Sequence, residues 1–143
     1  MKTDLVVAGY IIHDDKVLLI HHKKLNLWLP VGGHIEPGET PEDAILREVQ
    51  EEVGCAFEFH PKAEEKNNGQ VRILKPTRMQ VEKVPHHGHH INTIFFGKVM
   101  IWSNAVETDE QEKLRWFSEK ELQTENILES VCSSALDALK NVK

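Results

Sequence analysis

One continuous stretch of the chain, Gly33–Cys55, reads GHIEPGETPEDAILREVQEEVGC and carries the clearest pattern in the sequence. It opens with a loop that contains glycine and continues as a segment of good helix-forming residues. Thr40 suits the N-cap of a helix, and Pro41 suits its first position, because the first turn leaves the backbone N–H groups without partners anyway. Gly54 suits the C-terminal stop, where a left-handed backbone is favoured. These signals predict a helix over residues 41–53.

The predicted helix has an apolar stripe by which it would pack on the rest of the protein. Three aliphatic residues recur at every fourth position, which places them on one side of a helix: Ile45, Val49 and Val53. A helix docked by this stripe would hold the polar side chains beside it in fixed positions.

An acidic stripe lies next to the apolar one. Each helical residue turns by about 100°, so Glu48, Glu51 and Glu52 fall within one arc of roughly 100°. Three carboxylates on one stripe offer the oxygen ligands that a hard divalent cation such as Mg²⁺ prefers. A solvated acidic helix face is the alternative, but it explains neither the glycine loop nor Arg47.

The pattern Gly-x5-Glu-x7-Arg-Glu-U-x-Glu-Glu-x-Gly-U, where U is aliphatic, resembles the signature of the Nudix hydrolases. Members of that family cleave pyrophosphate bonds in nucleoside diphosphates linked to another group. The resemblance implies an α/β fold, an α/β/α sandwich around a central mixed sheet. The chain departs from the pattern at Cys55, where the family usually has Ile, Leu or Val. A buried cysteine acts as a small apolar residue, so this difference concerns packing.

The resemblance also implies a metal site. In the family the first and last glutamates of Arg-Glu-x-x-Glu-Glu bind the metal, which here means Glu48 and Glu52. Glu51 is expected to bind the metal or to orient bound water, and the backbone carbonyl of Gly32 is a further expected ligand. The expected cofactor is Mg²⁺, with Mn²⁺ as an alternative.

Two further residues of the stretch are expected to support catalysis. Arg47 lies four residues before Glu51, so it can hydrogen-bond a carboxylate and fix its rotamer; a simple surface ion pair is the alternative. Glu39 lies just before the helix, where a carboxylate also favours the helix dipole. Glu39 could therefore serve the helix dipole alone, or serve the dipole and support catalysis as well.

The family commonly supplies another acidic residue, a metal ligand or general base, from a loop before a late tryptophan-containing strand. Glu110, six residues before Trp116, is the first choice. Glu107, Asp109 and Glu112 compete with it, and a merely solvated acidic loop is the alternative for all four.

Residues that could contact the substrate are less well defined. The run Pro85–His90 holds four histidines, of which His87 and His89 are the candidates for a pocket that binds phosphate or stacks on a base. A transition-metal site or a solvated hairpin loop are the alternatives. His34 in the glycine loop and Trp28 just before it are further candidates, although tryptophan is more often part of a core.

Composition limits the class of protein. The 143 residues suit one domain, residues 1–143, with 40% hydrophobic and 28% charged residues. The formal net charge of −6 argues against an extended nucleic-acid surface, while a metal can still bridge acidic residues to a nucleotide. No apolar run suits a membrane span or a signal peptide. Two cysteines without metal-type spacing favour a reduced, cytoplasmic context over a disulfide.

The rest of the chain predicts strands and one more helix. Strands are expected at residues 5–12 and 16–20 as a hairpin, then near 55–60, 70–82, 91–101 and 114–117, while residues 25–31 lead into the glycine loop. A final helix is expected over residues 124–140, with a buried stripe of Leu128, Val131, Ala135 and Leu139.

The expected activity is Mg²⁺-dependent hydrolysis of a pyrophosphate bond in a small-molecule nucleotide, and the favoured substrate is a (deoxy)nucleoside triphosphate that yields a nucleoside monophosphate and pyrophosphate. The triphosphate rests on elimination, because markers of the ADP-ribose, dinucleoside polyphosphate and coenzyme A subfamilies are missing. A nucleotide sugar is an alternative substrate. A non-catalytic nucleotide-sensing module and an isoprenoid diphosphate isomerase are alternatives of other classes. A homodimer is expected from family habit alone.

Overall fold

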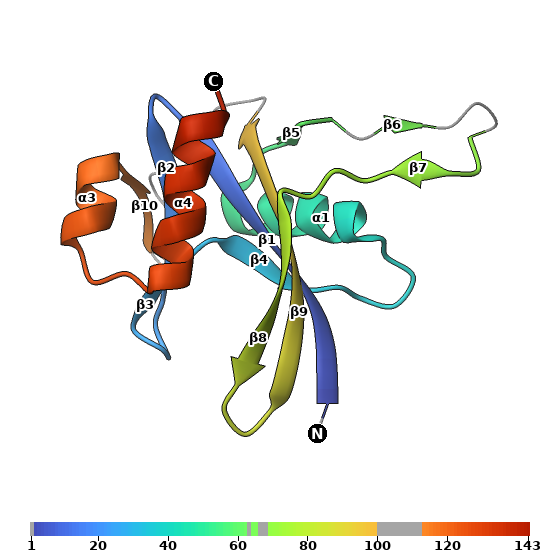
Figure 1. Ribbon diagram of the computed structural model, residues 1–143, viewed down its shortest axis with the longest axis horizontal. Coiled ribbons are helices and arrows are strands. Elements are labelled where there is room, and N and C mark those ends of the chain that lie inside the picture. The colour runs from blue at the N-terminus through green and yellow to red at the C-terminus, as the bar shows by residue number, and fades with distance from the viewer. Residues whose placement is uncertain (1, 63, 66–68, 100–112) are drawn as a thin grey trace.

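The computed structural model describes residues 2–62, 64–65, 69–99 and 113–143. Its first strand, β1 (Lys2–His13), runs through the centre of a mixed sheet (Figure 1). The other strands of this sheet are β2 (Lys16–His22), β3 (Leu27–Leu29), β4 (Val31–His34), β5 (Phe57–His60), β8 (Arg78–Val84), β9 (Gly88–Val99) and β10 (Lys113–Phe117).

Strand β1 has three partners. It runs parallel to β9 from Lys2 to Ile11, antiparallel to β4 in its middle, and antiparallel to β2 at its end. Strands β5 and β8 extend the sheet beyond β9, while β3 and β10 pair with β2. A separate short hairpin pairs β6 (Glu64–Glu65) with β7 (Arg72–Ile73).

Helices cover both faces of the sheet. Helix α1 (Pro41–Val53) buries Ile45, Val49 and Val53 against one face, together with Val7, Ile11 and other residues of the strands. Helices α3 (Glu119–Thr124) and α4 (Glu129–Asn141) pack on the opposite face, over Ala8, Tyr10 and Ile12 (Figure 1). The α/β/α sandwich expected from the sequence is therefore confirmed. Cys55 is buried and unpaired within the α1 layer, as expected for an apolar substitute.

Proline separates neighbouring strands at two places in the chain. The segment that leads into the glycine loop forms two strands, β3 and β4, which are separated at Pro30, a residue with no N–H to donate to a ladder. The strand expected over residues 70–82 separates into β7 and β8, with Pro76 between them. The strand expected over residues 91–101 begins earlier, at Gly88, so that His89 and His90 belong to β9 instead of to a loop.

The predicted final helix over residues 124–140 is wrong at its start. A separate helix, α3, begins at the N-cap Ser118, whose side chain and that of Glu121 form a reciprocal capping box. The chain then becomes extended at Glu125, and α4 begins at Glu129. Leu122 of α3 is buried, whereas Leu128, which the sequence predicts in the buried stripe, is 45% exposed.

The rest of the predicted C-terminal stripe is buried to different degrees. Val131 and Ala135 are buried, and Leu139 is partly buried against the same cluster. Within the described residues, no helix is long and apolar enough to cross a membrane.

The apolar stripe of α1 yields a stability prediction. Ile45 is fully buried. A Cβ on Gly9 would lie 2.9 Å from Cδ1 of Ile45, so this side chain packs directly on the backbone of β1. Ile45→Ala should lower the free energy of unfolding by about 2–5 kcal/mol, because it leaves a cavity. The matched control is Leu46→Ala, at a neighbouring position that is 40% exposed, with an expected change within about 0.5 kcal/mol. Equal urea midpoints for the two variants would contradict this packing.

Candidate active site

Helix α1 is fixed at both ends by its own sequence. The Thr40 hydroxyl accepts a hydrogen bond from the Asp43 backbone N–H at 3.1 Å, and the Asp43 carboxylate accepts one from the Thr40 N–H at 3.0 Å. Gly54 ends the helix with φ 76°, in the left-handed region that glycine adopts without strain. The helix bounds and the two caps predicted from the sequence are therefore confirmed, with Asp43 as an additional partner at the N-terminus.

Two glycines let β4 lie close to its neighbours. A Cβ on Gly32 would lie 2.1 Å from the carbonyl oxygen of Val7 in β1, and one on Gly33 would lie 2.5 Å from Oε1 of Glu48. At Gly32 the clash would be with backbone, so only glycine fits there, whereas a side chain at Gly33 would displace the carboxylate of Glu48 from its present position. The Glu48 carboxylate consequently packs directly against the backbone of β4, and its side chain is only 13% exposed.

Arg47 joins the helix to the loop that precedes it. Its Nε donates to Oε2 of Glu39 at 2.7 Å and its Nη2 donates to Oε1 of Glu39 at 2.9 Å, a two-pronged ion pair. Nη2 also donates to the backbone carbonyl of His34 at 3.0 Å. Oε1 of Glu39 in turn accepts the backbone N–H of Glu36 at 2.9 Å. The guanidinium therefore fixes the loop shape through both side-chain and backbone acceptors.

The same guanidinium reaches the acidic stripe of α1. Nη1 of Arg47 donates to Glu48 at 2.8 Å and makes a longer contact with Glu51 at 3.4 Å. Glu51 has a side chain 59% exposed, and Glu52 is half-buried on the same stripe. Arg47 is thus more than a surface ion pair, because its side chain is 22% exposed and its partners lie on two separate segments.

The ion pair shifts the protonation equilibria of both partners. The hydrogen bond from Arg47 holds the pKa of the Glu39 carboxyl below its usual value of 4.5, and the N–H of Glu36 lowers it further. The hydrogen bond to Glu39 raises the pKa of Arg47, as does the one to Glu48. Arg47 and Glu39 are therefore both charged at neutral pH.

The residues around Gly33 suit a hard divalent cation. Glu48 lies against the β4 backbone, and Glu51 and Glu52 follow on the same side of α1, so that all the side-chain donors are carboxylate oxygens. Arg47 offsets part of their mutual repulsion. Within the described ranges, the side-chain oxygens of these three glutamates do not all lie within 4.8 Å of one another. The all-oxygen donor set suits the expected cation, but the three carboxylates are not gathered around one point, so the ligand roles remain proposals.

The candidate substrate residues have separate positions. Trp28, on β3, is half-buried, with its ring 5.1 Å from Phe117 and 5.0 Å from His21 between centroids. His87 is exposed in the turn between β8 and β9, and His89 is exposed on β9. Glu110 and its three competitors, Glu107, Asp109 and Glu112, lie outside the described residues.

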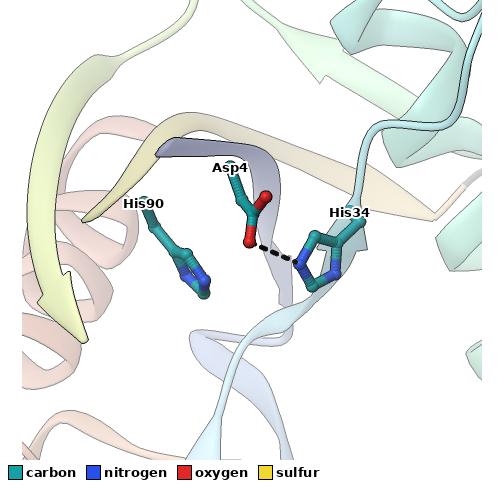
Figure 2. Close-up of side chains that lie close together, drawn as sticks. All are labelled: Asp4, His34 and His90. Atoms are coloured by element: carbon teal, nitrogen blue, oxygen red, sulfur yellow. Dashed lines mark ion pairs between the residues drawn. The ribbon is translucent and has the colours of Figure 1, made fainter. Parts of the chain in front are cut away.

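His34 has a different neighbourhood from the other candidates. Its ring lies beside Asp4 of β1 and His90 of β9 (Figure 2). Asp4 gave no signal in the sequence, because nothing local distinguishes it from a solvated terminal residue. The register of three strands brings these residues together, and that register was not predicted.

Comparison with known proteins assigns the family. The chain matches the family model of the NUDIX domain over residues 3–131. The chain belongs to the Nudix family. A solved NUDIX-family hydrolase from Clostridium perfringens superposes with a TM-score of 0.79 at 27% identity, with 100% of both chains covered.

Two curated Nudix relatives have names that mention oxidised nucleotides. A Bacillus subtilis protein named putative 8-oxo-dGTP diphosphatase is 44% identical over 103 residues, which cover 72% of this chain and 58% of that protein. Human 8-oxo-dGDP phosphatase NUDT18 is 37% identical over 75 residues, which cover 49% of this chain and 23% of that protein. The chain thus spans less than two thirds of the length of these relatives.

The ion pair between Arg47 and Glu39 yields a pH prediction. The folded-state pKa of Glu39 lies below 4.5, so the pair stabilises the fold above about pH 4.5 and loses this contribution as the pH falls through the lowered pKa. Arg47→Ala should raise the pKa of Glu39 towards its usual value, measured by NMR of carboxyl carbons. The internal control is Glu121, whose pKa Arg115 and Ser118 lower to about 2 and which should not change. An unchanged Glu39 pKa would contradict the network.

Proposed function

We propose that this Nudix protein hydrolyses a pyrophosphate bond in a nucleoside diphosphate-linked small molecule with the help of Mg²⁺, and that its substrate is a (deoxy)nucleoside triphosphate. One observation carries the proposal. Arg47 hydrogen-bonds Glu39, Glu48 and Glu51, and the carboxylate of Glu48 packs against the backbone of Gly33 in β4. A solvated acidic helix needs neither the two-pronged ion pair nor the close approach.

The reaction needs a positioned water and compensation of negative charge. A water oxygen bonds to one phosphorus as the P–O bond of the anhydride breaks, and the products are a nucleoside monophosphate, pyrophosphate and a proton. When bound, Mg²⁺ would offset charge on the phosphoryl oxygens. We assign the cation to Glu48, Glu52 and the carbonyl of Gly32, with Glu51 binding the cation or orienting the water.

The remaining residues have positioning roles in this proposal. Arg47 and Glu39 hold the carboxylate rotamers and the loop by the hydrogen bonds described above. Glu110 is proposed as the general base or a further ligand from the family resemblance. Trp28, His34, His87 and His89 remain proposed substrate contacts.

The name of the Bacillus subtilis relative supports a triphosphate substrate, whereas the name of the human relative refers to a diphosphate. The names of the Bacillus subtilis and human proteins both refer to 8-oxo-deoxyguanosine phosphates. Mg²⁺-dependent turnover should therefore be tested on canonical and oxidised nucleoside triphosphates and diphosphates, nucleotide sugars, ADP-ribose and dinucleoside polyphosphates. Mass spectrometry of the products then identifies the bond that breaks. We expect turnover of a triphosphate that EDTA abolishes, whereas nucleotide binding without turnover of any of these compounds would favour a sensing module.

The assignment of Glu52 predicts a kinetic phenotype. Glu52→Gln should lower kcat by several orders of magnitude, because a charged ligand is replaced by a neutral one, while the thermal midpoint stays nearly unchanged. Glu58→Gln, on the exposed side of β5, is the matched control and should keep wild-type kcat. Wild-type turnover by Glu52→Gln would remove this residue from the site.

A further inference from the structure

We propose that Asp4, His34 and His90 form a binding site for a divalent transition-metal ion of the Zn²⁺ type, separate from the carboxylates of α1. The three residues come from β1, β4 and β9, and in Figure 2 their side chains point towards a common space. Among the described residues they form a group whose possible ligand atoms all lie within 4.8 Å of one another.

Strand register places these residues together. Asp4 pairs with His90 in the parallel ladder of β1 and β9, and Val6 pairs with His34 in the antiparallel ladder of β1 and β4. Side chains alternate along a strand, so Asp4 and Val6 project from the same face of the sheet. The cluster is therefore built into the central strands and does not depend on a loop conformation.

The cluster and the glutamates lie on opposite faces of the sheet. Gly33 pairs with Val7 and faces Glu48 on the α1 side. His34 is the next residue along β4, so its side chain projects from the other face. Two adjacent residues of β4 therefore contact two separate groups of potential ligands.

The distances need only a small adjustment for coordination. Nε2 of His34 lies 3.7 Å from Oδ2 of Asp4, and the two imidazole centroids are 5.6 Å apart. Ligand atoms about 2.1 Å from a tetrahedral ion lie about 3.4 Å apart. The His34 side chain is 64% exposed, so it can rotate without disturbing the core.

The ligand types select a different ion from the one expected at α1. Two imidazoles and one carboxylate suit Zn²⁺, Co²⁺ or Ni²⁺, whereas Mg²⁺ prefers an all-oxygen shell. Three protein ligands leave a coordination position for water or a phosphate oxygen. The exposed Lys2 places its Nζ 4.0 Å from Oδ1 of Asp4, a distance at which solvent screens its effect.

Surrounding groups favour a positive ion at this place. Glu82 of β8 pairs with His90 across the ladder and adds a negative charge on the same face. Its carboxylate accepts hydrogen bonds from Asn92 at 2.9 Å and from Gln80 at 2.5 Å, which fix its orientation. An ion here would also join β1 and β9 to His34, whose backbone carbonyl accepts a hydrogen bond from Arg47.

Titration with Co²⁺ tests the proposal directly, because its visible absorption reports imidazole coordination in a low-symmetry site. Untagged wild-type protein should bind one equivalent with a visible band, and excess Zn²⁺ should remove that band. Glu52→Gln should keep the band, which separates this site from the proposed catalytic one. His34→Ala and His90→Ala should each weaken Co²⁺ binding at least tenfold.

The matched control is His89→Ala, since His89 neighbours His90 on β9 but projects from the other face. It should bind Co²⁺ as wild type does. Asp4→Asn offers a second variant with almost unchanged shape, and the thermal midpoints of all variants in EDTA verify their folding. The proposal is overturned if wild type shows no band at millimolar Co²⁺, if His90→Ala keeps the band, or if Glu52→Gln loses it.

Discussion

The ion pair between Arg47 and Glu39 is the interaction on which the geometry of the candidate site depends. One guanidinium bonds both oxygens of Glu39, the carbonyl of His34 and the carboxylate of Glu48. Arginine suits this position because its five donors lie in a rigid plane and stay charged. A lysine could neutralise one carboxylate, but it could not hold a loop, a strand end and a helix at the same time.

A second constraint is the missing side chain at Gly33. The carboxylate of Glu48 occupies the space that a Cβ would need, and the docked face of α1 leaves the helix little room to move away. Several features together fix the position of α1. Burial of its apolar stripe against the sheet sets its distance from β4, and Arg47 sets the orientation of its acidic side chains.

The sequence was most informative where local chemistry determines the structure. The bounds of α1, its N-cap Thr40 and its stop at Gly54 follow from local signals alone, and the structure confirms them. The contact between Arg47 and Glu51 was also expected, but it is the weaker of the contacts to the acidic stripe. The dominant partner, Glu39, lies eight residues away, and its pairing depends on how the loop folds back on the helix.

Features that depend on long-range pairing could not be predicted in the same way. Leu122 and Leu128 are both aliphatic, yet Leu122 is buried and Leu128 is 45% exposed, because the chain becomes extended at Glu125 and α4 begins only at Glu129. Asp4, His34 and His90 are brought together by the register of β1 with β4 and β9. No local pattern near Asp4 indicates that pairing.

The most direct test of the account measures Mn²⁺ affinity by electron paramagnetic resonance in the wild-type and Arg47→Ala proteins. Both should carry His90→Ala, so that only binding at the carboxylates is counted. If Arg47 positions these ligands, its removal should weaken Mn²⁺ binding by about 10–100-fold, the usual effect of losing a partner that orients metal ligands. Unchanged Mn²⁺ affinity in a folded Arg47→Ala protein would contradict the account.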